Sequence, residues 1–256
     1  MIGKREMALT SPDIFVLLGL GLVLGLKHAT EVDHVVAISS IVSEQRSLWR
    51  SSLVGALWGI GHTASLIVVG VVVLALRIAI PEHVTKWLEF GVALMIIGLA
   101  TSALVRSLRR RAALHIHQHR HDGLSHVHLH FHEQQTDHVD AAPSAHTHTV
   151  LRLGFKPLLV GAMHGLAGSA ALTVLLLTQI ASPAQGLLYL SVFGLGSIFG
   201  MLLMSALIGL PFALTARRVS GVHYGLQTIA GAVGLIFGLW YAYQTGIASG
   251  LLRTML

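Results

Sequence analysis

Apolar residues gather in six long segments along this chain, with short polar stretches between them. The segments cover residues 13–42, 53–80, 87–104, 157–180, 186–210 and 224–247. About 20 apolar residues suffice for a helix to cross a bilayer, and the sequence lacks the alternating pattern of a membrane β-barrel. The pattern therefore predicts an all-α membrane protein with six transmembrane helices.

The ends of three segments add detail. The second is expected to stop at Pro81 and the fifth before Pro211, because proline interrupts the hydrogen bonding of a helix interior. The first would extend roughly 45 Å at 1.5 Å per residue, although the hydrocarbon core is only about 30 Å thick. We therefore expect the first helix to tilt, break or protrude.

The composition agrees with a membrane location. Of the 256 residues, 54% are hydrophobic and 11% are charged, and the mean hydropathy is +0.72. The net charge of +6 does not indicate a nucleic-acid partner, because the basic residues cluster at helix ends. The absence of cysteine excludes disulfides and thiolate metal sites.

The positions of Lys and Arg predict how the chain lies in the inner membrane. Most of them fall in the first, third and fifth connections between helices, which the positive-inside rule puts in the cytoplasm. Both termini are then outside. Residues 1–26 imitate a signal peptide, but Lys27 and His28 follow in place of a cleavage site. We therefore interpret residues 1–26 as the start of the first helix.

The two halves of the chain resemble each other weakly. Residues 25–28 (GLKH) match residues 161–164 (GAMH), and residues 58–62 (WGIGH) match residues 193–197 (FGLGS). In the third and sixth helices, Gly91 and Gly98 match Gly231 and Gly238. Three helices per half would make these inverted repeats, as in many transporters. We predict a first repeat over residues 1–105, a His-rich disordered loop over 106–150 and a second repeat over 151–256.

The first helix contains an unusual run of ionisable residues, His28-Ala29-Thr30-Glu31-Val32-Asp33-His34. An ionisable side chain costs roughly 2.5–3.5 kcal/mol at the centre of a membrane helix, and such residues usually mark an ion path. Imidazole and carboxylate ligands suit nickel, cobalt, zinc and ferrous iron. The run therefore predicts a transition-metal site with His28, Asp33 and His34 as ligands.

These three residues would not share one face of an ideal helix, because Asp33 lies about 140° from His28 and His34 about 100° further. Either the helix is locally unwound here, or the residues reach different partners. Unwound backbone that lines a cavity is how many transporters build ion sites.

Three more residues are candidates. His62 is the natural fourth ligand, since glycines beside it let the second helix approach the first. His164 occupies the repeat position of His28, as a fifth ligand or a gate residue. Glu31 is a ligand, a proton acceptor or an ion-pair partner of Lys27. The alternative is that these groups form a hydrogen-bonded network that only fixes packing.

A polar insert between the halves, residues 106–149, contains eleven of the 17 histidines. Alternating histidines bind divalent metal weakly at many sites, and the composition cannot form a core, so the insert should be disordered without metal. Metal holding should fail below about pH 6, because only neutral imidazole binds metal. The insert is a cytoplasmic metal reservoir or sensor, or a solubilising linker.

These motifs resemble a known family. The pattern His28-x4-Asp33-His34 is similar to the signature of the nickel/cobalt transporter family (NiCoT) and the related NicO group, and residues 58–63 look like the family's second signature. Residues 164–170 resemble a segment of the shorter six-helix members, including urease-accessory-type transporters. The resemblance implies that the His/Asp motif takes part in metal selection and transport. The chain departs from the eight-helix members, which carry an acidic signature in the later half, because it has no carboxylate after residue 150.

The motifs and the resemblance together predict a transporter, and not an enzyme, for Ni²⁺ and also Co²⁺. The metal ion is the substrate, and no resident cofactor is expected. A metallochaperone or a second copy of the chain are further candidate partners. The alternatives are a transporter of zinc, iron or manganese, a membrane metalloenzyme, and a metal sensor or accessory subunit of a larger importer.

Overall fold

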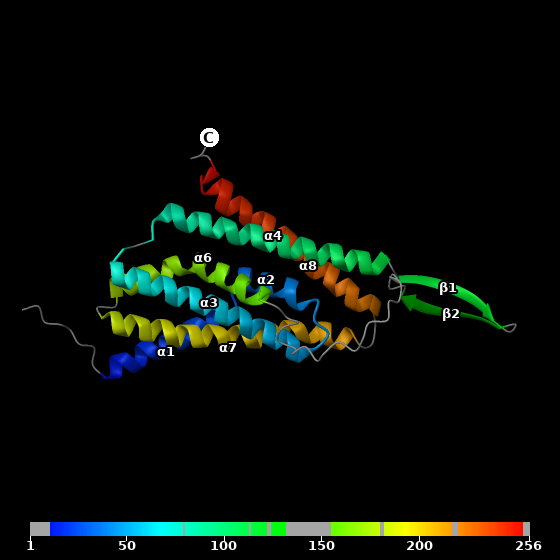
Figure 1. The fold of residues 1–256 in the computed structure, drawn as a ribbon, viewed down its shortest axis with the longest axis horizontal. Coiled ribbons are helices and arrows are strands. Elements are labelled where there is room, and N and C mark those ends of the chain that lie inside the picture. Colours follow the sequence, from blue (N-terminus) through cyan, green and yellow to red (C-terminus); the bar gives the residue numbers. More distant parts are fainter. Residues whose placement is uncertain are drawn as a thin grey trace, which may run out of the picture.

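The computed structural model describes residues 11–78, 80–112, 114–121, 124–131, 155–179, 182–216 and 220–252 (Figure 1). Its helices are α1 (Ser11–His28), α2 (Val32–Val42), α3 (Leu48–Leu76), α4 (Glu82–Ala112), α6 (Lys156–Gln179), α7 (Pro183–Thr215) and α8 (Ser220–Ala242), which continues into the π-helix η1 (Tyr243–Ala248). Two strands, β1 (Leu114–His121) and β2 (Leu124–Phe131), lie between α4 and α6. The bundle itself is helical, as the apolar segments predict.

Four stretches of helix are long and apolar enough to cross a membrane, namely Leu48–Leu76, Glu82–Arg110, Pro183–Thr215 and Gly221–Ala248. The pair α1 and α2 makes a fifth if it counts as one span, since the two helices qualify together but are bent by 54°. The remaining helix, α6, has 24 residues and is not among them. The described residues thus contain four or five of the six predicted spans.

The break between α1 and α2 falls inside the run of ionisable residues. Thr30 Oγ1 donates a hydrogen bond to Lys27 O at 2.6 Å, where α1 ends. Glu31 then adopts an extended conformation (φ −62°, ψ 145°) immediately before α2. Of the outcomes open to the long first helix, the structure has the break, and of the two alternatives for the His/Asp run it has the locally unwound backbone. Residues 1–10, which belong to the stretch that we interpret as the start of this helix, lie outside the described part.

Two helix ends differ from the predictions. We expected the second helix to reach residue 80, but α3 ends at Leu76 because Arg77 takes the left-handed conformation (φ 53°). We expected the fifth helix to end before Pro211, and this was wrong, since α7 continues to Thr215. Thr215 Oγ1 donates to Pro211 O at 2.7 Å, and Ala216 N donates to Phe212 O at 3.0 Å, so the last turn closes despite the proline.

The helices form two groups that meet at α2 (Figure 1). In one group α3 packs against α6 and α7, and α1 packs against α7; in the other α4 packs against α8. The short helix α2 contacts α4, α7 and α8. Its apolar residues join a buried cluster that includes Val36, Ile38, Trp58 and Ile96. The polar start of α2 is therefore held in the interior of the bundle.

The closest helix contacts fall at equivalent positions of the two halves. A Cβ added to Gly25 of α1 would overlap with Phe193 O, and one added to Gly161 of α6 would overlap with Trp58 O. In the sequence match, Gly25 corresponds to Gly161 and Trp58 to Phe193. A second such pair of contacts joins Gly196 to Leu22 and Gly61 to Leu158. The α1–α7 and α3–α6 contacts thus use the same pattern of glycine on backbone.

The glycines of the third and sixth helices do not follow this pattern. A Cβ on Gly231 or Gly238 of α8 would press on α4 near Leu104 and Ile97. Their sequence counterparts Gly91 and Gly98 have open space at this position. The close approach of α4 and α8 therefore depends on glycines from the second half of the chain alone.

The described part of the His-rich insert differs from the disordered loop that we expected. α4 continues to Ala112, and β1 and β2 then form an antiparallel hairpin. Its register sets His115 opposite His130, His117 opposite His128 and His119 opposite His126. The alternation of histidine with other residues has the two-residue period of a strand. An isolated hairpin is marginally stable in water, so disorder without metal stays a prediction, and residues 132–150 lie outside the described part.

Candidate metal centre

The break in the first span brings together two imidazoles. His28 is the last residue of α1, and His34 lies in the first turn of α2. Their ring centroids are 4.4 Å apart, with an angle of 67° between the planes. His34 is 1% exposed, and the side chain of His28 is 12% exposed. Two predicted ligands therefore meet inside the bundle.

A third imidazole comes from α3. His62 is fully buried, and its Nε2 lies 3.0 Å from Nε2 of His28. α3 packs closely against α6 and α7. Gly59 lies directly against Ile198 of α7, and Gly61 lies directly against Leu158 of α6. His28, His34 and His62 each offer one nitrogen, and these nitrogens lie within 4.8 Å of one another. Nitrogens that bind one ion with bonds of about 2 Å lie about 3–4 Å apart, and the His28–His62 pair already has this spacing.

Asp33 links His34 to an imidazole from the second half. Its Oδ1 accepts a hydrogen bond from His34 N at 2.8 Å and lies 2.9 Å from His34 Nδ1. Its Oδ2 lies 2.9 Å from Nε2 of His164 in α6. Asp33, His34 and His164 form a second group with potential ligand atoms within 4.8 Å. A carboxylate in this position either binds a metal or orients the imidazoles that do.

Several buried nitrogens at this centre have no hydrogen-bond partner among the described residues. They are His34 Nε2, His62 Nδ1 and His164 Nδ1, with Trp58 Nε1 beside them. Buried polar atoms are normally satisfied, and each exception costs roughly 1–3 kcal/mol. His34 belongs to both groups of potential ligands. The unpaired Nε2 of this shared imidazole is therefore the nitrogen of the centre that is free to bind a cation.

Glu31 lies at the edge of this centre and belongs to neither group. Its side chain is 54% exposed, and its Oε2 lies 3.0 Å from Nδ1 of His28. We had considered a metal ligand, a proton acceptor and an ion-pair partner of Lys27. In the described structure its ion-pair partner is His28, where the carboxylate holds the ring with Nε2 turned toward His62.

A cavity of about 380 Å³ borders the centre. His28, Asp33, His34 and His164 line it, together with two residues that the sequence analysis missed, Glu89 of α4 and Tyr241 of α8. Glu89 carried a usable signal, because it is a carboxylate inside the third apolar segment. Tyr241 carried none.

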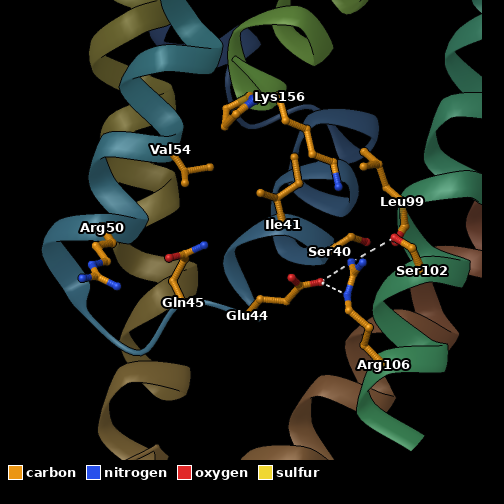
Figure 2. Close-up of a pocket in the computed structure, with 11 residues that line it drawn as sticks. Ser40, Ile41, Glu44, Gln45, Arg50, Val54, Leu99, Ser102, Arg106 and Lys156 are labelled. Carbon is orange, nitrogen blue, oxygen red and sulfur yellow. Dashed lines mark hydrogen bonds and ion pairs between the residues drawn. The ribbon is translucent and has the colours of Figure 1, made fainter. Parts of the chain in front are cut away.

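A second cavity, of about 200 Å³, lies at the other end of α2 (Figure 2). It is lined by residues of α2, α3, α4 and α6 and by the connection that follows α2. Arg106 of α4 donates to Glu44 Oε1 from Nε at 2.8 Å and to Ser102 Oγ from Nη2 at 3.0 Å. Apolar side chains of the buried cluster, among them Val54 and Leu99, line it as well. The ion pair joins α4 to the end of α2.

No family model and no solved structure matches this chain. The urease accessory protein UreH of Bacillus sp. (strain TB-90) is 39% identical over 242 residues, which cover 94% of this chain and 96% of that protein. The chloroplast protein FOR GROWTH AND FERTILITY 1 of Arabidopsis thaliana is 26% identical, over 86% of this chain and 56% of its own length. The high-affinity nickel transport protein of Cupriavidus necator is 30% identical over 93 residues, or 35% of this chain and 26% of that protein. The match to UreH spans nearly the whole of both proteins, and the chain therefore belongs to the UreH family of nickel/cobalt transporter-type membrane proteins.

Proposed function

We propose that this chain carries Ni²⁺, and also Co²⁺, across the inner membrane through the centre around His34. The observation that carries the proposal is the approach of Nε2 of His28 and Nε2 of His62 to 3.0 Å inside the bundle, beside the unpaired Nε2 of His34. Imidazole-rich sites suit late first-row divalent metals. The names of two relatives, a urease accessory protein and a nickel transport protein, support nickel in particular.

In this proposal each residue has a distinct role. His28, His34 and His62 bind the ion through nitrogen. Asp33 fixes the rings of His34 and His164 by hydrogen bonds to both, as carboxylates do around metal-binding histidines. His164 is an additional ligand, which the ion meets in the second group, beside Asp33 and His34. Glu31 orients His28. The ion is cargo, so the chain needs no resident cofactor.

We further propose that the six apolar segments form two inverted repeats of three helices, with α6 as the fourth span. At 1.5 Å per residue, its 24 residues extend roughly 36 Å, enough to cross a bilayer. The matched contacts of Gly25 with Phe193 and of Gly161 with Trp58 support the symmetry. The metal centre then lies where the repeats meet, which is the usual position of a transporter's substrate site.

The two cavities are the two approaches to this site. The cavity beside Glu89 is open to the imidazoles. The other cavity is separated from them by the buried cluster around Val36 and Ile96. With both termini outside, the second cavity and the His-rich insert face the cytoplasm. The insert then holds metal on the cytoplasmic side, and a metallochaperone or a second copy of the chain would be partners there.

Two alternatives have different standing. The same ligands suit zinc and iron, so a transporter for one of these metals remains the competing hypothesis. A membrane metalloenzyme is disfavoured, because the names of the relatives point to transport or to an accessory role and not to catalysis.

The proposal is tested by the radioactive nickel content of cells at sub-micromolar external nickel. Cells would express the chain, its His34→Ala variant, its His83→Ala variant, or nothing. His83 is exposed at the start of α4 and is the matched control. We expect wild type and His83→Ala to change the nickel content equally, upward for an importer and downward for an exporter, and His34→Ala to match empty cells. Equal content in all four would contradict nickel as the substrate.

A further inference from the structure

The two cavities have opposite charge. Three carboxylates, Glu31, Asp33 and Glu89, and one cation, Lys27, line the cavity beside the imidazoles. The cavity in Figure 2 is lined by three cations, Arg50, Arg106 and Lys156, and by Glu44, which Arg106 already binds. A cleft that carries one sign of charge attracts counter-ions and raises their local concentration. Divalent cations should therefore enter the cavity beside the imidazoles.

Glu89 is the carboxylate in this cavity that has no other evident task. Asp33 bonds two histidines, and Glu31 pairs with His28. Glu89 makes no ion pair or hydrogen bond among the described residues, since the nearby Lys86 binds Glu82 at 2.7 Å. It lies two turns into α4, is partly buried, and lines the same cavity as Asp33. An unpaired carboxylate inside a membrane helix is costly and usually functional.

A second observation, the two buried imidazoles that line this cavity, supports a cation as its occupant. His34 and His164 both line it and are 1% and 2% exposed. Each has a ring nitrogen, His34 Nε2 and His164 Nδ1, without a partner in the described structure. A hydrated ion that enters this cavity would first meet the acidic groups toward the outside. Further in, it would exchange its water for imidazole nitrogen.

We propose that Glu89 is the capture residue of this cavity, where it holds a free, hydrated divalent cation before the ion reaches the imidazoles. Six waters occupy roughly 180 Å³ at about 30 Å³ each, so a fully hydrated ion fits the cavity of about 380 Å³. The carboxylates repel an anionic chelate, such as a metal bound to excess citrate. The inference rests on the proposed transport of nickel and adds the form in which the metal is accepted.

The test uses purified full-length chain in vesicles and initial rates of nickel uptake. Glu89→Gln should raise the KM on the order of tenfold with the maximal rate unchanged, and Glu89→Asp, which keeps the charge, should restore most of the loss. The matched control is His83→Ala on the same helix, which removes an exposed side chain that does not line the cavity. Rates in citrate should follow the free nickel concentration and not the total.

The outcomes separate the two proposals. No uptake by wild type would refute the transport of nickel itself. Uptake by wild type with an unchanged KM in Glu89→Gln would overturn the capture role alone. Uptake that follows total nickel in citrate would overturn the preference for the free ion. A Glu89→Gln protein that elutes as wild type in size-exclusion chromatography excludes misfolding as the cause of a changed KM.

Discussion

Asp33 is the residue on which both groups of potential ligands depend. It contacts His34 from the same helix and His164 from 131 positions away. The contact between His28 and His62 does not involve Asp33. Asp33 nevertheless determines which ring nitrogen of His34 is available to these two residues, because it engages the other one. The carboxylate thus connects the two halves of the chain at the metal centre.

Replacement of Asp33 by Asn should therefore weaken nickel binding without removing a ring. The amide keeps the shape but loses the charge that orients His34 and His164, and loss of such a partner typically costs 10- to 100-fold in metal affinity. Equilibrium dialysis of purified protein with nickel would measure this. Glu82→Gln is the control that removes a remote carboxylate, and an unchanged affinity in Asp33→Asn would remove Asp33 from the centre.

At this scale the sequence revealed the residues but not their partners. His28, Asp33, His34 and His62 stand out because ionisable groups are rare in apolar segments. The contact between Asp33 and His164 depends on how α6 packs, and no local pattern encodes it. Glu89 met the same criterion as the others and was overlooked because it stands alone near the start of its helix.

The elements that shape the centre are a broken helix and three closely packed ones. The excess length of the first apolar segment predicted that its helix would tilt, break or protrude. The mismatch of faces predicted either unwinding at the His/Asp run or different partners for its residues, and the structure has the break at this run. The end of α7 was predicted wrongly because a proline near a helix end removes only one hydrogen bond. The hairpin β1–β2 was not predicted, because the polar composition of the insert indicated disorder. The two-residue period of its histidines, which is typical of a strand, was the signal for it.

Gly61 tests whether close packing of α3 positions His62. Gly61→Ala should lower the free energy of unfolding by roughly 1–3 kcal/mol and weaken nickel binding. The reason is that a Cβ at this position overlaps with Leu158 O and pushes α3 away from α6. The control is Gly91→Ala in α4, where a Cβ meets open space and alanine should be neutral or stabilising by about 0.5–1 kcal/mol. The readout is the melting temperature in detergent, and equal melting of the two variants would contradict the packing argument.

At the scale of the molecule, the candidate metal centre borders an acidic cavity at the start of α2, and a basic cavity lies at the other end of this helix. The imidazoles line the acidic cavity, whereas apolar residues of the buried cluster and the ion pair of Glu44 with Arg106 line the basic one. If the termini are outside, as the basic connections predict, the acidic cavity faces outward in this conformation. The overall helical bundle followed from hydropathy, whereas the cavities follow from long-range packing.

The central claim is that this chain alone moves nickel through its buried imidazoles. The most direct test is the uptake of radioactive nickel by vesicles that contain only the purified chain, compared with His62→Ala and with protein-free vesicles. The account predicts saturable uptake by wild type and uptake by His62→Ala no greater than that of protein-free vesicles. Equal uptake by wild type and His62→Ala, or none above protein-free vesicles by either, would contradict it.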